Sequence, residues 1–70
     1  MANNLRKLSQ DEYLRLESLM ENVPNPDDTY TATGWHYELA GLLREFGFRP
    51  IGHYQAYELG IKLLELGYDP

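Results

Sequence analysis

Seventy residues suffice for one small domain, and the absence of cysteine excludes disulfides and zinc–thiolate sites as reinforcement. Hydrophobic residues make up 43% of the chain, which is enough for a core and too much for a disordered acidic tail. Eleven acidic residues against six basic ones give a formal charge of −5, which disfavours nucleic acid and anionic lipid as partners. We therefore expect a single domain over residues 1–70, with no membrane partner and with nucleic acid an unlikely one.

The N-terminal residues 1–8 are expected to form a polar lead-in before the first helix. They contain two basic residues but no apolar core of a signal peptide, and no later apolar run approaches the length of a membrane span. A cysteine-free sequence also fits a reducing compartment. These features predict a cytoplasmic protein.

The first helix is expected over residues 9–22. Ser9 and Glu12 have the spacing of a capping box, in which each side chain accepts a hydrogen bond from the other residue's backbone amide. Apolar residues then recur at steps of three and four, and Pro24 ends the pattern. Residues 23–34 are rich in turn-forming residues and lack periodicity, so they are predicted to form a long loop.

The second helix is expected over residues 35–46, with an apolar stripe that begins at Trp35. Gly47 follows its last turn, where a left-handed backbone conformation is easiest for glycine. Phe48 can then fold back and pack on Leu43. This is the hydrophobic contact of a Schellman motif, in which the residue two positions beyond the helix end contacts the last helical turn.

The third helix is expected over residues 53–66, and its ending repeats that of the second. Residues 37–50 and 57–70 align without gaps, so Gly67 and Tyr68 correspond to Gly47 and Phe48. The short connector 47–52 predicts that the second and third helices form an antiparallel or angled pair, with the first helix over their shared groove. The expected fold is therefore all-α, a small three-helix domain.

The sequence contains no pattern that is typical of a catalytic or cofactor site. His36 and His53 have no further ligand at helical spacing, and a zinc site needs three or four. The hydroxyl residues are not part of a nucleophile elbow, and the glycines do not form a phosphate-binding loop. We expect no metal, no cofactor and no enzymatic activity.

Aromatic residues are the strongest indication of function, since six tyrosines, two phenylalanines and one tryptophan account for 13% of the chain. Successive helical residues are rotated by about 100°, so runs of large residues at the two helix starts cannot all face one core. Some must be exposed, and exposed aromatic residues near arginine are typical of interaction hot spots. The candidate partner-binding residues are His36, Tyr37, Arg49, His53, Tyr54 and Tyr57.

These observations predict a small, acidic, non-enzymatic regulator that binds another protein, as an inhibitor or adaptor, and that can also form a homodimer. Two alternatives are linked to nucleic acid: an atypical helix-turn-helix DNA binder, and an acidic mimic of DNA. A further alternative is a structural subunit of a larger assembly. The candidate residues form one surface only if the starts of the second and third helices lie close together. In a strictly antiparallel pair these starts would be ~15–20 Å apart.

Overall fold

Three helices make up most of the fold: α1 (Gln10–Glu21), α2 (Thr29–Glu45) and α3 (Gly52–Leu66). The computed structural model describes residues 5–25 and 27–70, without the side chains of residues 29–31. The prediction of a small all-α, three-helix domain is confirmed. None of the helices among the described residues is long and apolar enough to cross a membrane.

The start of α2 is the main error in the predicted helix boundaries. The helix begins at Thr29, six residues before the expected position 35, so the predicted loop 23–34 is about half helical. The carbonyl of Asp28 accepts a hydrogen bond of 2.9 Å from the amide of Ala32, which is the first turn of this helix. Threonine and glycine are weak helix formers, which made residues 29–34 read as a loop, but the surrounding structure overrides that preference.

Two short strands, which the sequence pattern did not predict, pair with each other beside the start of α1 and the end of α3. β1 (Leu8–Ser9) precedes α1, and β2 (Tyr68–Asp69) follows α3. They pair in parallel, with Leu8 opposite Tyr68 and Ser9 opposite Asp69. The pairing fixes the entry of α1 beside the exit of α3, and the side chain of Leu8 is fully buried there.

The N-terminus of α1 has the predicted capping box. The Glu12 amide donates to Ser9 Oγ at 3.2 Å, and the Ser9 amide donates to Glu12 Oε1 at 2.9 Å. Arg6 extends this arrangement, since its guanidinium donates to both Glu12 carboxylate oxygens at 3.0 Å and to the carbonyl of Phe46 at 2.7 Å. It also lies over the ring of Phe48, 5.4 Å from the centroid. Arg6 therefore links the start of α1 to the end of α2.

The C-terminus of α2 forms the predicted Schellman motif. The Phe48 amide donates to the Leu43 carbonyl at 2.9 Å, and the Gly47 amide donates to the Arg44 carbonyl at 3.0 Å. Gly47 has a φ of +100°, and both Phe48 and Leu43 are buried in the core. The motif redirects the chain from the helix axis and buries the aromatic residue that follows.

Replacement of Gly47 by alanine should destabilise the fold by about 1 kcal/mol, because a β-carbon is strained at positive φ. The space around the position is open, with no atom within 4 Å of an added β-carbon, so the effect isolates the backbone conformation. Urea unfolding of Gly47→Ala beside the wild type measures it. A neutral or stabilising result would contradict the left-handed assignment at this helix end.

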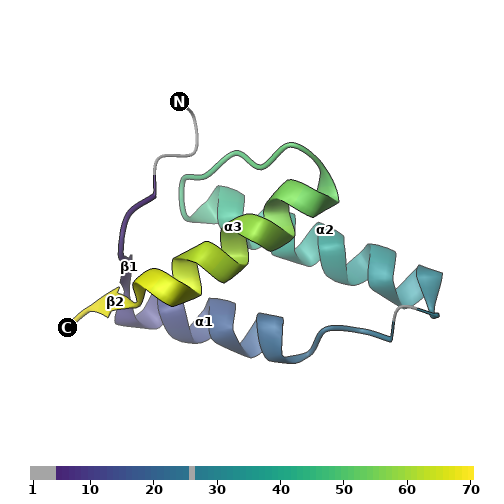
Figure 1. Ribbon diagram of the computed structural model, residues 1–70, viewed down its shortest axis with the longest axis horizontal. Coiled ribbons are helices and arrows are strands. Elements are labelled where there is room, and N and C mark those ends of the chain that lie inside the picture. Colours follow the sequence, from purple (N-terminus) through teal and green to yellow (C-terminus); the bar gives the residue numbers. More distant parts are fainter. Residues whose placement is uncertain (1–4, 26) are drawn as a thin grey trace.

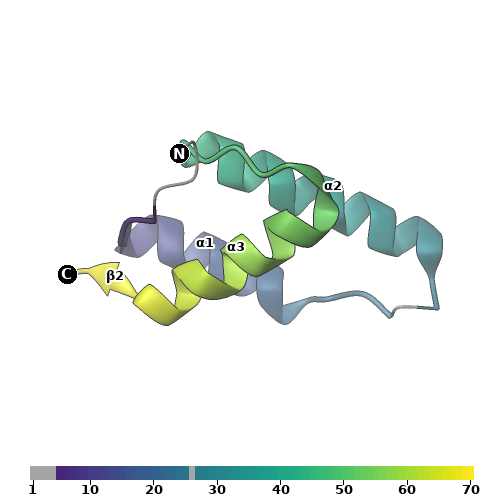
Figure 2. The ribbon, with the colours of Figure 1, turned by 45° about the horizontal axis from the view of Figure 1, so that its top comes forward.

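The connector between α2 and α3 sets their relative direction. Figures 1 and 2 show that it runs back along α2 before α3 begins, so that α2 and α3 point in the same general direction at an angle. α1 lies beside them in the opposite direction. Of the antiparallel and angled arrangements expected for α2 and α3, the angled one is observed, because the connector turns at Gly47 and then runs back along α2 before α3 begins.

The core lies where α2 and α3 cross and α1 packs against them. Gly60 of α3 belongs to it: a β-carbon there would lie 3.1 Å from Met20 Sδ of α1. The close approach expected at this internal glycine is therefore made by a side chain of α1, whereas Gly41 of α2 faces open space. The buried hydrophobic residues are Leu8, Leu16, Trp35, Leu39, Ala40, Leu43, Phe46, Phe48, Ala56, Leu59 and Leu63.

Candidate functional site

The extended connector brings the starts of the aromatic segments in α2 and α3 together. The rings of His36 and His53 lie 4.9 Å apart, and that of Tyr37 packs edge-on against His53 at 5.2 Å. Trp35 continues the series, with its ring 5.0 Å from His36 and 6.2 Å from Tyr57. Five rings from two helices are therefore in continuous contact. We call these five residues the aromatic cluster.

Two tyrosines give this region its exposed aromatic area. The side chain of Tyr37 is 65% exposed and that of Tyr54 is 78% exposed. Tyr54 lies three residues before Tyr57 on α3, and residues at this spacing are neighbours on a helix surface. Tyr54 thus extends the aromatic cluster outward along α3.

Trp35 anchors the aromatic cluster to the fold. Its side chain is only 7% exposed, and its Nε1 donates a hydrogen bond of 2.9 Å to the carbonyl of Leu19 in α1. The sequence pattern predicted that Trp35 faces inward, which is correct. The sequence pattern did not predict that the indole ring of Trp35 would contact both His36 and Tyr57, because the contact with Tyr57 depends on how α3 crosses α2.

The remaining candidate, Arg49, lies exposed on the connector, four residues before His53. The structure therefore places His36, Tyr37, His53 and Tyr57 in mutual or chained ring contact through Trp35, and Tyr54 follows His53 directly in α3. These ring contacts form because residues 35–37, which lie six residues or more after the start of α2 at Thr29, pack beside the start of α3.

His36 has the most unusual environment among these residues. It is half-buried, and its Nδ1 atom is buried without a hydrogen-bond partner among the described residues. Burial and, to a smaller extent, the neighbouring charge of His53 lower the pKa of His36 below its ordinary value of 6.5. The neutral imidazole is therefore the form that the folded protein favours.

Acidification should weaken the fold through His36. Because the unfolded chain binds this proton more readily than the folded protein does, stability is fully present above pH ~6.5 and decreases as the pH falls below it. Urea unfolding at pH ~7.5 and ~5.5 measures this slope, and His36→Phe should reduce it. An unchanged slope in the variant would show that other groups dominate.

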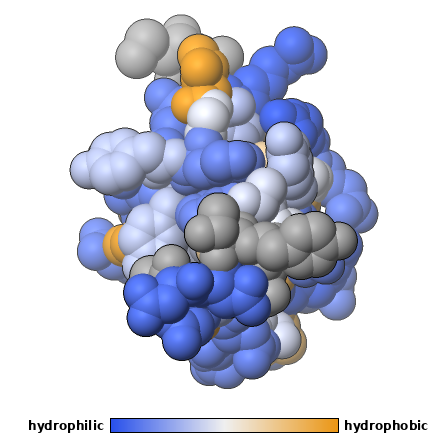
Figure 3. All heavy atoms as spheres, turned by 90° about the vertical axis from the view of Figure 1, so that its right-hand side faces the viewer, coloured by the Kyte–Doolittle hydropathy of each residue, from blue (hydrophilic) through white to orange (hydrophobic). Residues whose placement is uncertain are grey.

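The face at the end of the molecule where α2 begins is mostly hydrophilic, and hydrophobic atoms are scattered over it in small groups (Figure 3). The aromatic cluster is likewise mixed in character, since tyrosine and histidine combine rings with polar atoms. Such a surface suits contacts that are partly aromatic and partly hydrogen-bonded.

The described residues contain no group of three or more histidine, aspartate or glutamate side chains that could hold a metal ion. The rings of the aromatic cluster can make stacking and edge-on contacts, and its tyrosines and histidines can form hydrogen bonds. Comparison with protein-family models, with curated proteins and with solved structures finds no match for this chain.

Proposed function

We propose that this chain is a small cytoplasmic, non-enzymatic regulator that binds another protein through the aromatic cluster and Tyr54. The proposal is supported chiefly by the continuous ring contacts between α2 and α3, which link aromatic residues inside α2 to those near the start of α3. A regulator of this kind would act as an inhibitor or adaptor, because its effect would come from occupying a surface of its partner.

Exposed tyrosines suit this role for a physical reason. A tyrosine ring buries a large area while only two side-chain torsions become fixed, so its entropic cost on binding is low. Tyr37 is also held by the edge-on contact with His53, at 5.2 Å between ring centroids, which restricts it before binding. Preorganised side chains retain more of their contact energy as affinity.

A comparative capture experiment tests the proposal. The wild-type chain and a Tyr37→Ala/Tyr54→Ala double variant would be immobilised, and proteins retained from host extract would be identified by mass spectrometry. A partner should be enriched by the wild type and lost with the double variant, whereas Glu21→Ala, a change on exposed α1 surface, should retain it. Equal retention by all three chains would contradict the proposal.

A homodimer is the second candidate assembly, favoured by the same exposed tyrosines. Sedimentation at high micromolar concentration distinguishes it, because a monomer has a mass of 8.1 kDa. If the chain dimerises through the aromatic cluster, the double variant should sediment as a monomer under the same conditions.

The nucleic-acid alternatives differ from this proposal in their dependence on salt. Lys62 of α3 lies on the same helix as the exposed carboxylates of Glu58 and Glu65, so α3 offers little positive charge to phosphates. We expect no DNA or RNA binding at ~150 mM salt, where phosphate-driven affinity is already weakened. A gel shift at sub-micromolar protein under these conditions would favour the helix-turn-helix alternative.

A further inference from the structure

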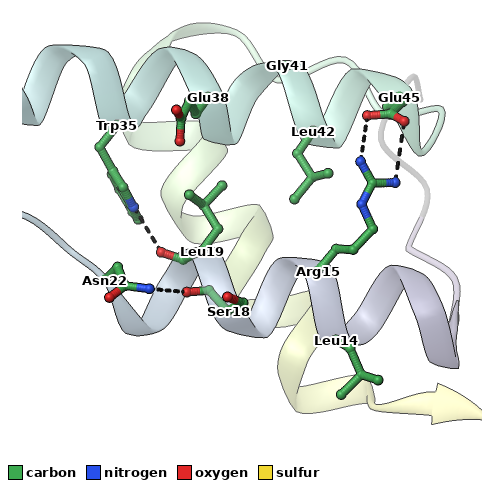
Figure 4. Close-up of a pocket in the computed structure, with 10 residues that line it drawn as sticks. All are labelled: Leu14, Arg15, Ser18, Leu19, Asn22, Trp35, Glu38, Gly41, Leu42 and Glu45. Atoms are coloured by element: carbon green, nitrogen blue, oxygen red, sulfur yellow. Dashed lines mark hydrogen bonds and ion pairs between the residues drawn. The ribbon is translucent and has the colours of Figure 1, made fainter.

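An open groove runs between α1 and α2, and α3 lies behind it (Figure 4). Its volume is about 790 Å³, and it extends along α2 from Trp35 to Glu45. Ten residues of a helix span ~15 Å, or nearly three turns. The groove is separate from the exposed side chains of Tyr37 and Tyr54, and it shares only Trp35 with the aromatic cluster.

Two polar contacts cross from α1 to α2 at the ends of the groove. At one end, Trp35 Nε1 donates to the carbonyl of Leu19 at 2.9 Å. At the other end, the Arg15 guanidinium donates to both carboxylate oxygens of Glu45, at 3.0 and 3.3 Å (Figure 4). Each contact joins α1 to α2, and that of Trp35 is the stronger constraint, because its side chain is buried whereas the Arg15–Glu45 pair is exposed.

The lining of the groove is mixed: leucines and Trp35 form its apolar part, and Ser18, Asn22 and Glu38 add polar groups. Leu19 and Leu42 are half-buried in the groove and Leu14 is 52% exposed. Gly41 is exposed, and no atom lies within 4 Å of the position that its β-carbon would occupy. The backbone of a bound segment can therefore approach α2 closely at this point. Glu38 projects from α2 beside Trp35 (Figure 4).

We propose that this groove binds an amphipathic helix of another protein, which places leucine-like side chains between α1 and α2 and a lysine or arginine against Glu38. The groove has the length of a short helix, and its leucines and Trp35 offer the apolar contacts that helix-in-groove recognition uses. The negative charge of the chain favours one kind of bound helix over another. The chain carries a formal charge of −5, and Glu45 is already paired with Arg15, so a basic helix is attracted while a second copy of this acidic chain is repelled.

The test uses synthetic helical peptides of about 15 residues, the length that spans the groove with a turn to spare. One peptide carries leucines at steps of three and four with flanking lysines, and its partner has glutamate in place of every lysine. Trp35, the only tryptophan of the chain, lines the groove and reports binding through its fluorescence. The basic peptide should bind saturably and about tenfold or more tightly than the acidic one.

Three variants test whether the peptides bind in the groove. Glu38→Lys should reverse the preference between the two peptides, whereas Glu65→Lys, the same charge change on exposed α3 surface, should leave it unchanged. Gly41→Leu should abolish binding while far-ultraviolet circular dichroism and the Tm are retained, because leucine is a better helix former than glycine and the position is open.

Several outcomes would overturn the proposal. These are equal affinity for both peptides, equal effects of Glu38→Lys and Glu65→Lys, and undiminished binding to Gly41→Leu. Sedimentation that shows a dimer which Gly41→Leu converts to a monomer would identify a second copy as the occupant instead. None of these outcomes depends on Tyr37 or Tyr54, so failure here leaves the proposed role of the aromatic cluster standing.

Discussion

Replacing Arg6 with alanine should destabilise the fold by about 2 kcal/mol, although half of this side chain is in contact with solvent. The guanidinium makes two charge-assisted hydrogen bonds to Glu12 and one to the Phe46 carbonyl, and it covers the ring of Phe48. Hydrogen bonds to charged groups contribute ~1.5–3 kcal/mol each when buried. The Arg6 and Glu12 side chains are 45% and 24% exposed, so solvent screening reduces that contribution.

The dependence of stability on pH provides a second measurement of the same contact. The hydrogen bonds from Arg6, supported by the backbone amide of Ser9, lower the pKa of Glu12 from 4.5 to about 2. A lowered carboxyl pKa stabilises the folded state above the unfolded value, and this contribution is lost as the pH falls from ~4.5 towards ~2. Urea unfolding over this range should show a steep loss for the wild type and a shallower one for Arg6→Ala.

A double-mutant cycle with Glu12→Gln separates the ion pair from the other contacts of Arg6. Arg15→Ala is the matched control, since Arg15 also makes a bidentate pair, with Glu45, and also lies over a phenylalanine ring. That pair is more exposed and lies outside a helix cap, so its loss should be clearly smaller than that of Arg6. Equal losses for the two arginines would show that capping gives Arg6 no special role.

The parts of this fold that could be predicted from the sequence are those held by short-range contacts. The capping box needs only the spacing of Ser9 and Glu12, and the Schellman motif needs only Gly47 and an apolar residue after it. Both involve residues within one or two turns of each other, so their geometry follows from local backbone preferences. The helix count and the all-α class follow from the same periodic patterns.

The features that were missed depend on residues far apart in the chain. Arg6 reaches the Phe46 carbonyl across 40 positions, and no spacing rule connects the two. The similar sequences that end α2 and α3 also show the influence of residues far apart in the chain. Gly47 and Gly67 both have positive φ, but Phe48 enters the core whereas Tyr68 starts β2 and packs on Tyr13, 4.9 Å between ring centroids. Similar local sequences diverge here because different elements lie beside them.

The exposure of two candidate residues was predictable from the sequence, but the ring contacts among the candidates were not. The argument that adjacent large residues cannot all be buried correctly placed Tyr37 and Tyr54 at the surface. Whether they form one surface depends on the direction of the connector, which length alone left undecided. The groove between α1 and α2 could not be predicted, because it depends on how two helices pack, with contacts such as Trp35 to Leu19 and Arg15 to Glu45.

Tyr54→Ala should weaken the complex with the partner protein by about 2 kcal/mol or more, roughly 30-fold in Kd, as aromatic hot spots do. The isolated chain should keep its stability, since 78% of the side chain is exposed and little packing is lost. Calorimetric titration of the captured partner measures the first quantity, and urea unfolding measures the second. Tyr37→Ala should weaken binding as well, because its ring packs against His53 on the same surface.

The controls are the acidic residues of α1. Glu17→Ala and Glu21→Ala should change the affinity far less than Tyr54→Ala, because these side chains lie on α1, away from the ring contacts between α2 and α3. Because aromatic contacts are only weakly screened by ions, the loss from Tyr54→Ala should also persist at high salt. If the acidic variants dominate while the variants at Tyr37, Tyr54 and Tyr57 are silent, the surface recognises charge. That result would replace the aromatic proposal with the acidic mimic of DNA.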